Sequence, residues 1–398
     1  MTVLALILVA GPFILAAYAY AIYPAILWLL ARRGAADVAS AGAALPLVTV
    51  VIPAYNEEAQ ITGAVESMLA QDYPADRRQI LVLSDASTDA TDVIVRGYTA
   101  HGVELLRMPV RAGKTAAENA AFAHIRGDIV INTDASVRFK EDGVRRLVAA
   151  MADSRVGVAS TTDVSVTRAA GGSAAEAGYV DYEMRVRSLE TKAGGIVGAS
   201  GSGYAIRTEL HRKPVRADLS RDFSAALTAH REGFRAVSVA DAICFVPRTP
   251  SLEREYRRKV RTISRGMATL YFNRDLLNPG RHGAFAWKLL THKLCRWLVP
   301  LSTLLALFGL LLLSPTHIWS RYALAAAGAL GILAVIGARW PDTRKVPSWL
   351  HAGTLGALAS NLAVIHASWR FIRGHRDHIW EPTRRPHAQA EQDRLGSA

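Results

Sequence analysis

The sequence predicts an α/β fold, in which a mostly parallel β-sheet is flanked by helices and further helices at both ends of the chain meet a membrane. Three observations lead to this prediction. Apolar runs of strand length alternate with segments of helical periodicity through the middle of the chain. Three of these runs end in small and acidic residues at roughly regular spacing. The two ends of the chain are almost purely apolar.

The expected strands are short and apolar, which is typical of strands buried on both faces of a sheet. They are VTVVI from Val48, followed by QILVLS (79–84), VELLRM (103–108), DIVINTD (128–134) and VGVAS (156–160). Helices are expected over 57–70, 89–101, 117–125 and 141–151. A glycine-rich strand or loop (194–206) follows, then a helix (221–231), a strand or strand pair (236–246) and a basic helix (253–271).

Polar residues gather at the ends of the expected strands, as in the segments 84–89 (SDASTD) and 132–136 (NTDAS). The carboxyl ends of parallel strands meet at one edge of an open α/β sheet, where ligands bind. There Asp85 can accept hydrogen bonds from a base or ribose, and Asp134 can hold a divalent cation that bridges phosphates. Lys114 can reach the phosphates as a point charge. Each aspartate alone also suits a turn or helix cap, but the combination predicts a nucleotide-sugar site.

The N-terminal segment predicts a membrane anchor. Residues 3–31 carry no charge, which is enough to span a hydrocarbon core of about 30 Å at about 1.5 Å per residue. A signal peptide, the alternative, has a basic start and a shorter apolar core, so we expect a retained helix. Arg32 and Arg33 follow it directly and place the next segment in the cytoplasm.

The C-terminal third contains three further apolar candidates, Trp297–Leu313, Tyr322–Ala338 and Gly353–Phe371. We expect Asn361 and His366 in the last of these to face other helices, because polar groups facing lipid are costly. A third full crossing would place the tail outside, whereas the arginines of the tail favour the inside. Either the last segment is re-entrant or the tail breaks the rule, and both interpretations stay open.

These signals divide the chain into six parts. We expect an N-terminal transmembrane helix (1–33), a linker (34–46), a cytoplasmic α/β domain (47–272), an interfacial amphipathic helix (273–296), about three transmembrane helices (297–372) and a basic polar tail (373–398). The net charge of +13 suits an anionic membrane leaflet or an anionic substrate. Nucleic acid is not expected as a partner, because no recognition module appears. The two cysteines, Cys244 and Cys295, provide neither a disulfide framework nor a metal cluster.

Over roughly residues 47–272 the chain resembles the inverting family 2 glycosyltransferases with the GT-A fold, especially their membrane-integrated polysaccharide synthase-like branch. The resemblance rests on IPAYNEE (52–58), SDxSTD (84–89), GKxxAxN (113–119), a DxD-like element (134–136) and a glycine-rich acceptor segment (198–205). It implies nucleotide-sugar binding by Pro53, Ala54, Tyr55, Glu57, Asp85, Lys114 and Asp134. It implies acceptor binding by Gly201 and Ser202, and a Mg²⁺ or Mn²⁺ ion held by Asp134 and Ser136.

The resemblance also assigns the chemistry. Asp222 is then the general base that deprotonates the acceptor hydroxyl, while Arg258 and Arg261 neutralise the leaving diphosphate. The sequence departs from the family pattern at Ser136, which replaces the second acid of DxD, and at Arg221, where the family usually has an acid beside the base. The Gln-x-x-Arg-Trp signature of processive synthases falls on 258–262, which lacks both Gln and Trp. Processive polymerisation is therefore not implied.

The sequence thus predicts a multi-pass enzyme of the cell (inner) membrane with a cytoplasmic catalytic domain. It would transfer a sugar from a nucleotide-sugar, with a UDP-sugar as the expected donor, to a glycan or lipid acceptor in cell-envelope polysaccharide synthesis, with synthase or export proteins as potential partners. Two alternatives stay open. One is transfer of a single sugar to a polyprenyl phosphate. The other is a non-catalytic, nucleotide-sugar-binding subunit of a synthase complex.

Overall fold

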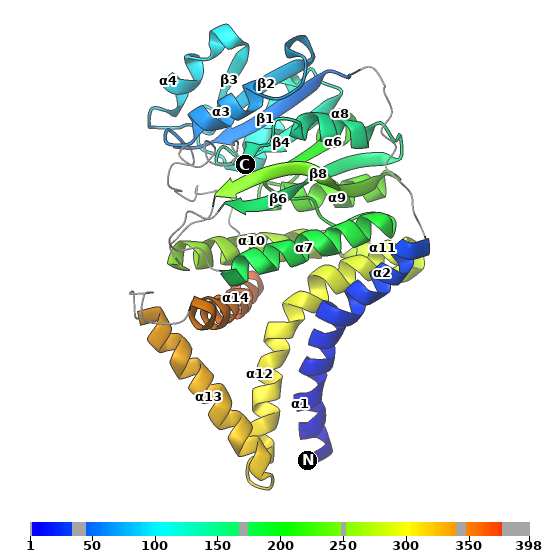
Figure 1. The fold of residues 1–398 in the computed structure, drawn as a ribbon, viewed down its shortest axis with the longest axis vertical. Helices are drawn as coiled ribbons and strands as arrows, with labels where there is room; N and C mark the ends of the chain where they lie inside the picture. The colour runs from blue at the N-terminus through cyan, green and yellow to red at the C-terminus, as the bar shows by residue number, and fades with distance from the viewer. Residues whose placement is uncertain (1, 34–44, 167–173, 248–251, 340–347, 376–398) are drawn as a thin grey trace.

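A computed structural model of the chain describes residues 2–33, 45–166, 174–247, 252–339 and 348–375. Most of the predicted linker (34–46) and of the predicted basic tail (373–398) lies outside these residues. The sheet occupies one end of the molecule, a layer of helices lies beneath it, and long helices extend from this layer away from the sheet (Figure 1).

The strands are β1 (Val48–Ala54), β2 (Arg78–Ser84), β3 (Val103–Arg107), β4 (Ile129–Thr133), β5 (Arg138–Phe139), β6 (Val156–Val166), β7 (Gly203–Arg207) and β8 (Arg235–Pro247). The helices around the sheet are α3 (Ile61–Leu69), α4 (Thr91–Arg96), α5 (Lys114–Ala120), α6 (Gly143–Met151), α8 (Thr208–His211) and α9 (Arg221–Arg231). The remaining helices are α1 (Thr2–Ala17), α2 (Tyr23–Arg33), α7 (Ala174–Lys192), α10 (Leu252–Phe272), α11 (Pro279–Leu289), α12 (Arg296–Leu313), α13 (Ile318–Arg339) and α14 (Ser348–Ile372).

The strands form one sheet in the order β3-β2-β1-β4-β7-β6-β8-β5. The half that contains β3, β2, β1 and β4 is parallel throughout. In the other half β6 and β8 are parallel, whereas β7 runs antiparallel to β4 and β6, and β5 antiparallel to β8. The predicted α/β class is confirmed. The predicted parallel arrangement applies fully to the half whose strand ends carry the expected nucleotide site.

Alternate residues of β1 pack into cores on opposite faces of the sheet. Val50 and Ile52 belong to one apolar cluster, with residues of α3 and α6, and Val51 belongs to another, with residues of α5, α8 and α9. Every residue of β1 is buried, as expected for a strand covered on both faces. The two clusters hold the strand ends at a fixed edge of the sheet.

The largest difference from the expected elements is α7, a segment that has no periodic apolar pattern and was not predicted as a helix. This helix contacts α2, α14, β6 and β8 and forms, with α10, the layer beneath the sheet (Figure 1). Smaller differences occur at helix starts. The helix expected from 57 begins at Ile61, because residues 57–60 form a turn in which the carbonyl of Glu57 accepts the amide of Gln60 at 2.8 Å.

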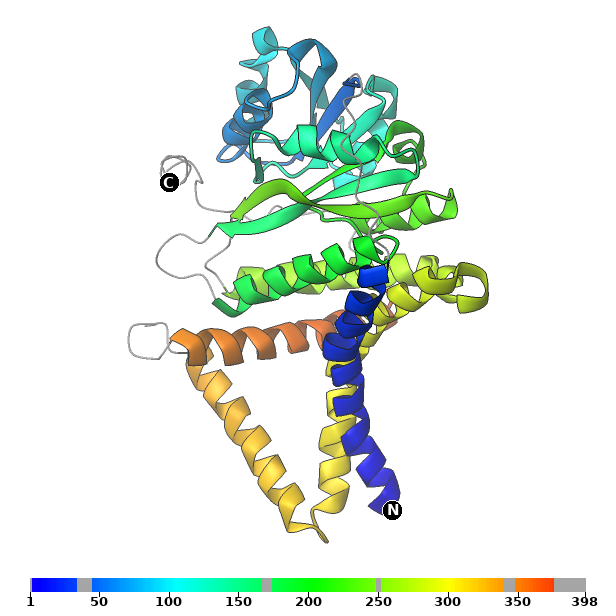
Figure 2. The same ribbon diagram turned by 45° about the vertical axis from the view of Figure 1, so that its right-hand side comes forward.

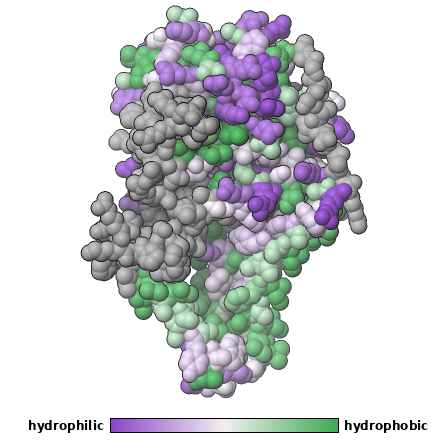
Figure 3. All heavy atoms as spheres, viewed as in Figure 1, coloured by the Kyte–Doolittle hydropathy of each residue, from purple (hydrophilic) through white to green (hydrophobic). Residues whose placement is uncertain are grey.

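Two helical segments, Thr2–Arg32 and Pro279–Leu313, are long and apolar enough to cross a membrane by length and composition. They include α1 and α12, which run side by side away from the sheet (Figure 1). Gly309 permits this approach, since a Cβ there would lie 2.8 Å from the carbonyl oxygen of Ala5. Figure 3 shows hydrophobic residues gathered over this end of the molecule, whereas the sheet end is mostly hydrophilic.

The last two helices run in different directions. After a short loop, α13 returns from the far end of α12 toward the layer beneath the sheet, and α14 then lies along that layer (Figure 2). α14 packs against α10 through Val260, Ala363 and Ala367. The hydroxyl of Tyr256 lies 3.1 Å from Nδ1 of His366. His366 therefore faces another helix, as expected.

Candidate active site

The candidate site begins where β1 and β2 end. Asn56 and Ala86, which follow these strand ends, have φ values of 52° and 58°, a backbone conformation that non-glycine residues rarely adopt. The buried Asp85, which directly follows β2, donates its backbone N–H to the carbonyl of Ala54, the last residue of β1, at 2.9 Å. Strained backbone at the ends of adjacent strands is common at ligand sites. This places Pro53, Ala54, Tyr55 and Asp85 at one edge of the sheet.

The carboxylate of Asp85 holds the loop that leads into α5. Its two oxygens accept the backbone N–H groups of Ala112 and Gly113, each at 2.8 Å. From the same loop the Arg111 guanidinium lies over the Tyr55 ring, 3.8 Å from its centroid. Arg111 was not predicted as a site residue. Its position two residues before Gly113 and Lys114 is the feature of the sequence that could have indicated it. The aromatic–guanidinium stack provides a flat surface beside Asp85.

Lys114 and Asp134 form the ion pair at the centre of the site. Gly113, with a φ of 90°, turns the chain into α5, and Lys114 in the first turn points back to Asp134 at the end of β4. Lys114 Nζ lies 2.5 Å from Asp134 Oδ1. Burial alone would lower the pKa of Lys114, but the carboxylates of Asp134, Glu118 and Asp222 outweigh it and raise the pKa. The lysine is therefore a fixed positive charge.

Asp222 lies in the first turn of α9, beside the glycine-rich segment. Its Oδ1 accepts a hydrogen bond from the hydroxyl of Ser220, the residue that caps the helix. A Cβ added to Gly201 would lie 3.1 Å from Asp222 Oδ2, so the backbone of the glycine-rich segment passes directly by this carboxylate. The carbonyl of Ser202 accepts the hydroxyl of Thr133, the last residue of β4, at 3.0 Å. The predicted acceptor segment thus lies between Asp222 and the strand that carries Asp134.

Arg221, which stands where the related enzymes usually have an acid, points away from the acceptor segment into the protein. Its Nε lies 3.8 Å from Oε2 of Glu118, and both side chains are buried. Its two terminal nitrogens donate to Asn119 Oδ1 at 2.5 Å and to the carbonyl of His211 at 2.7 Å. Burial, the largest influence, raises the pKa of Glu118. Arg221 therefore joins the start of α9 to α5 rather than assisting Asp222 as a second acid.

On α10, Arg265 contacts α5, the helix that begins with Lys114. It donates to the Thr115 hydroxyl at 2.8 Å and to the carbonyl of Leu219 at 2.5 Å. Arg258 instead forms a bidentate pair with Glu255 on its own helix, at 2.5 and 2.9 Å. Arg261 is half-buried on the same helix. Arg265 was not selected from the sequence, although it continues the basic series of α10 by one further turn.

The site offers one carboxylate to a divalent cation. Asp134 Oδ1 is engaged by Lys114, whereas no hydrogen bond to Oδ2 occurs within the described ranges. Ser136 is buried two residues further on. No cluster of three His, Cys, Asp or Glu side chains suited to a metal occurs among the described residues. A Mg²⁺ or Mn²⁺ ion therefore fits here only if diphosphate oxygens and water complete its coordination.

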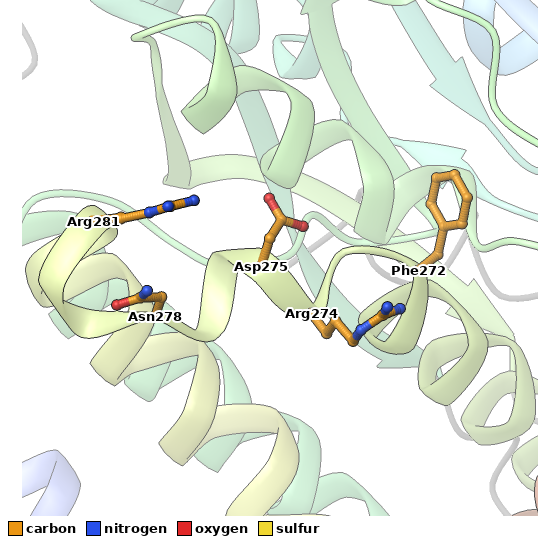
Figure 4. A pocket seen from close by; sticks show the side chains of 5 residues that line it. All are labelled: Phe272, Arg274, Asp275, Asn278 and Arg281. Carbon is orange, nitrogen blue, oxygen red and sulfur yellow. The ribbon is translucent and has the colours of Figure 1, made fainter.

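A separate cavity of about 450 Å³ opens where α10 gives way to α11. It is lined by Phe272, Arg274, Asp275, Asn278 and Arg281 (Figure 4). Arg281 points toward Asp275 in this view, whereas Arg274 extends away from both. Asp275 also pairs with Arg231 at 2.7 Å. None of the residues selected from the sequence lines this cavity.

Comparison with known proteins agrees with this geometry. The family described as "Glycosyl transferase family 2" matches residues 49–200, and "Glycosyl transferase family group 2" matches residues 129–338, more than half of the chain. An N-acetylglucosaminyltransferase of Rhizobium meliloti (strain 1021) is 26% identical over 54% of this chain and 55% of that protein. A beta-monoglucosyldiacylglycerol synthase of Synechocystis sp. is 35% identical over 26% of this chain and 22% of that protein. The chain spans about half or less of the length of these relatives.

A solved structure matches nearly the whole chain. It is the mannosyltransferase PcManGT from Pyrobaculum calidifontis in complex with GDP-Man and Mn²⁺. The TM-score is 0.71 at 23% sequence identity, over 93% of this chain and 100% of that one. The match confirms the predicted GT-A fold.

Proposed function

The chain belongs to the family 2 glycosyltransferases, and we propose that it transfers one sugar, with inversion, from a nucleotide-sugar donor to a glycan or lipid acceptor at a membrane. The convergence of Lys114, Asp134 and Asp222 carries the proposal, because all three charges lie close enough for both carboxylates to raise the pKa of the lysine. Such a site combines a diphosphate-binding cation with a base on the acceptor side. A UDP-sugar remains the predicted donor, for use in cell-envelope polysaccharide synthesis.

In the proposed mechanism the donor lies along the ends of β1, β2 and β4. Tyr55 and Arg111 flank the nucleoside, Asp85 and the loop it holds border the ribose, and Lys114 neutralises the diphosphate as it leaves. The acceptor enters along the glycine-rich segment. Asp222 removes the proton of its hydroxyl as the oxygen attacks the anomeric carbon from the face opposite the diphosphate, and this geometry gives inversion.

We further propose that a divalent cation binds Asp134 together with the donor diphosphate, where it would stabilise negative charge on the phosphate oxygens. The unengaged Oδ2 of Asp134 supports this assignment, and the Mn²⁺ in the PcManGT complex agrees with it. The role of Ser136 would then be secondary, because a hydroxyl is a weaker ligand than a carboxylate.

We also propose that the enzyme sits at the cell membrane with its sheet domain in the cytoplasm. α1, α12 and α13 would enter the membrane, and α14 would stay on the cytoplasmic side. The packing of α14 along α10 supports this topology, which would keep the arginines that follow α14 inside, as the positive-inside rule requires. A last segment that does not cross the membrane then accounts better for the sequence than a third full crossing.

The test is a donor screen with the full chain in detergent. UDP-glucose, UDP-N-acetylglucosamine and GDP-mannose are offered with and without Mn²⁺, and the released nucleoside diphosphate is measured. Asp222→Asn should lower transfer by a factor on the order of 10² to 10⁴ with nucleotide binding near normal, and Asp241→Asn on the exposed surface of β8 is the control. Retained turnover in Asp222→Asn would refute the assignment of the base. Nucleotide binding without release from any donor would favour the non-catalytic alternative.

A further inference from the structure

Asp163, which was not predicted as a site residue, forms hydrogen bonds with the predicted acceptor segment. It lies on β6, and its Oδ2 accepts hydrogen bonds from the hydroxyls of Ser200 at 2.6 Å and Ser202 at 3.0 Å. Its Oδ1 lies 3.3 Å from the Thr161 hydroxyl and 3.3 Å from Cys244 Sγ. One carboxylate thus receives four polar contacts, two of them from the segment predicted to bind the acceptor.

The contacts to Asp163 fix the position of Gly201 relative to Asp222. Ser200 and Ser202 flank this glycine, and a Cβ added to it would lie 3.1 Å from Asp222 Oδ2. The backbone N–H of Ser200 also donates to the Ser160 hydroxyl at 2.8 Å, which ties the same turn to β6 a second time. Any shift of this turn would change the space in front of the candidate base. Asp163 therefore holds the turn that passes Asp222 without touching Asp222 itself.

The same contacts set the polarity of the acceptor side. A hydroxyl has one proton, so Ser202, which donates that proton to Asp163, can offer a ligand only its lone pairs. Asp163 and Asp222 place a carboxylate on either side of the turn. A neutral acceptor hydroxyl can donate to these groups, whereas a phosphate acceptor would be repelled by two negative charges. Cations also lie near this turn. Lys293 lies beside Gly198, two residues before Ser200, whereas Lys114 and Arg187 are already paired with Asp134 at 2.5 Å and with Glu183 at 3.2 Å.

We propose that Asp163 is a positioning residue of the acceptor site, which holds Ser200–Ser202 against Asp222 and so selects a neutral hydroxyl acceptor over a phosphate. This inference rests on the proposed function. It discriminates between the two acceptor classes that the sequence left open.

The test compares wild type, Asp163→Asn and the surface control Asp241→Asn, as full chains in a detergent without hydroxyl groups. Octyl β-glucoside and dioleoylglycerol are the hydroxyl probes, and geranyl phosphate is the phosphate probe. Wild type should transfer to a hydroxyl probe and not to geranyl phosphate. Asp163→Asn should raise KM for that hydroxyl probe about tenfold or more, as expected for lost hydrogen bonds to a charged group. Its nucleotide affinity should be unchanged, and Asp241→Asn should behave as wild type.

A second variant guards against misfolding of Asp163→Asn. Ser200→Ala combined with Ser202→Ala removes the partners and leaves Asp163 in place, so it should reproduce the rise in acceptor KM, and the triple variant should add little to it. Transfer by wild type only to geranyl phosphate, or to neither hydroxyl probe, overturns the inference, as does an unchanged acceptor KM in both variants. Failure of the proposed function is distinct, because wild type would then release no nucleoside diphosphate from any donor.

Discussion

Arg265 of α10 donates a hydrogen bond of 2.8 Å to the hydroxyl of Thr115, the residue that follows Lys114. The same nitrogen also reaches the carbonyls of Ala217 and Leu219, which precede Ser220 and Asp222. One guanidinium thus joins the helix that carries Lys114 to the loop that leads into the candidate base. It does so from a helix in the layer next to the apolar end of the molecule (Figure 1).

We expect Arg265→Ala to weaken both halves of the site together. Loss of the charge-assisted hydrogen bonds to Thr115 and Leu219 should reduce kcat/KM by at least about 10- to 100-fold, since a single such bond contributes roughly 1.5–3 kcal/mol. Kinetics with the best donor of the screen measure the effect. Arg257→Ala on the exposed face of the same helix is the matched control, because Arg257 pairs with Glu253, one turn earlier, at 2.5 Å and is exposed. Equal activity of the two variants would contradict the prediction.

The ion pair between Arg221 and Glu118 should matter more for stability than for chemistry. Arg221→Ala would leave Lys114 as the cation facing the buried Glu118 carboxylate and would also remove the hydrogen bonds to Asn119 and His211, which together should cost about 3–5 kcal/mol. The shift of the unfolding midpoint in denaturant measures this loss of stability. Arg231→Ala, which breaks an exposed pair on the same helix, should cost about 0–1 kcal/mol.

The matching double variant separates an ion pair from simple packing. Arg221→Met with Glu118→Leu replaces both charges by apolar groups, so it should be more stable than Arg221→Ala. A double variant that is less stable than the single one would show that the hydrogen bonds of Arg221 to Asn119 and His211 dominate instead.

Metal dependence should rest on Asp134 rather than on Ser136. Asp134→Asn removes the one carboxylate available to the cation, so Mn²⁺-dependent donor affinity should fall about 100-fold, equivalent to roughly 3 kcal/mol. Ser136→Ala should keep most of the Mn²⁺-dependent donor affinity. Donor binding titrated with Mn²⁺, and again after chelation, measures both variants. A larger loss in Ser136→Ala than in Asp134→Asn would reverse the assignment.

The predicted site residues that the structure brings together are those with a local signal. Asp85 and Asp134 follow apolar strands, and Lys114 follows a glycine that starts a helix, so the pattern of each segment is enough to place them at one edge of a parallel sheet. Arg265 and Asp163 have no such signal. Their partners lie far away in sequence, and only the pairing of β6 with β7 and the packing of α10 bring them to the site.

α7 was missed for a different physical reason. Its charged residues Arg187 and Glu190 are buried and Glu183 is largely so, which reverses the usual pattern of an amphipathic helix. They are satisfied by residues far along the chain, since His292 contacts Glu183 at 2.9 Å and Glu190 at 2.7 Å. Read alone, the segment has the composition of a solvent-exposed surface. Its partners come from the helix that leads into α12, so no local reading could predict its burial.

His211 should make the stability of the protein depend on pH near neutrality. It is buried at the end of α8, with Nε2 3.2 Å from Asn132 Oδ1 and with its ring against Phe122. Burial, reinforced by the positive charges of Arg221 and Arg212, lowers its pKa well below the usual 6.5. The folded protein therefore holds this histidine neutral at a pH where the unfolded chain would protonate it.

The sign of the effect follows from proton uptake. Below about pH 6.5 the unfolded chain binds one proton more than the folded one at this position, so stability is complete above that pH and falls as the pH decreases, by up to about 1.4 kcal/mol per pH unit. Glu118 acts in the opposite direction, because its raised pKa favours the folded state as the pH falls. Glu118 is present in wild type and in both histidine variants, so its contribution to the pH dependence of stability cancels when they are compared.

Unfolding midpoints between pH 7.5 and 5 measure the difference. We expect His211→Gln, which can still donate to Asn132 and does not titrate, to lose less stability than wild type as the pH falls from 6.5. His101→Gln is the control, because His101 is exposed and its removal should leave the slope unchanged. If His211→Gln and wild type lose stability in parallel, the buried neutral state of His211 is wrong, and the acid sensitivity must come from another group.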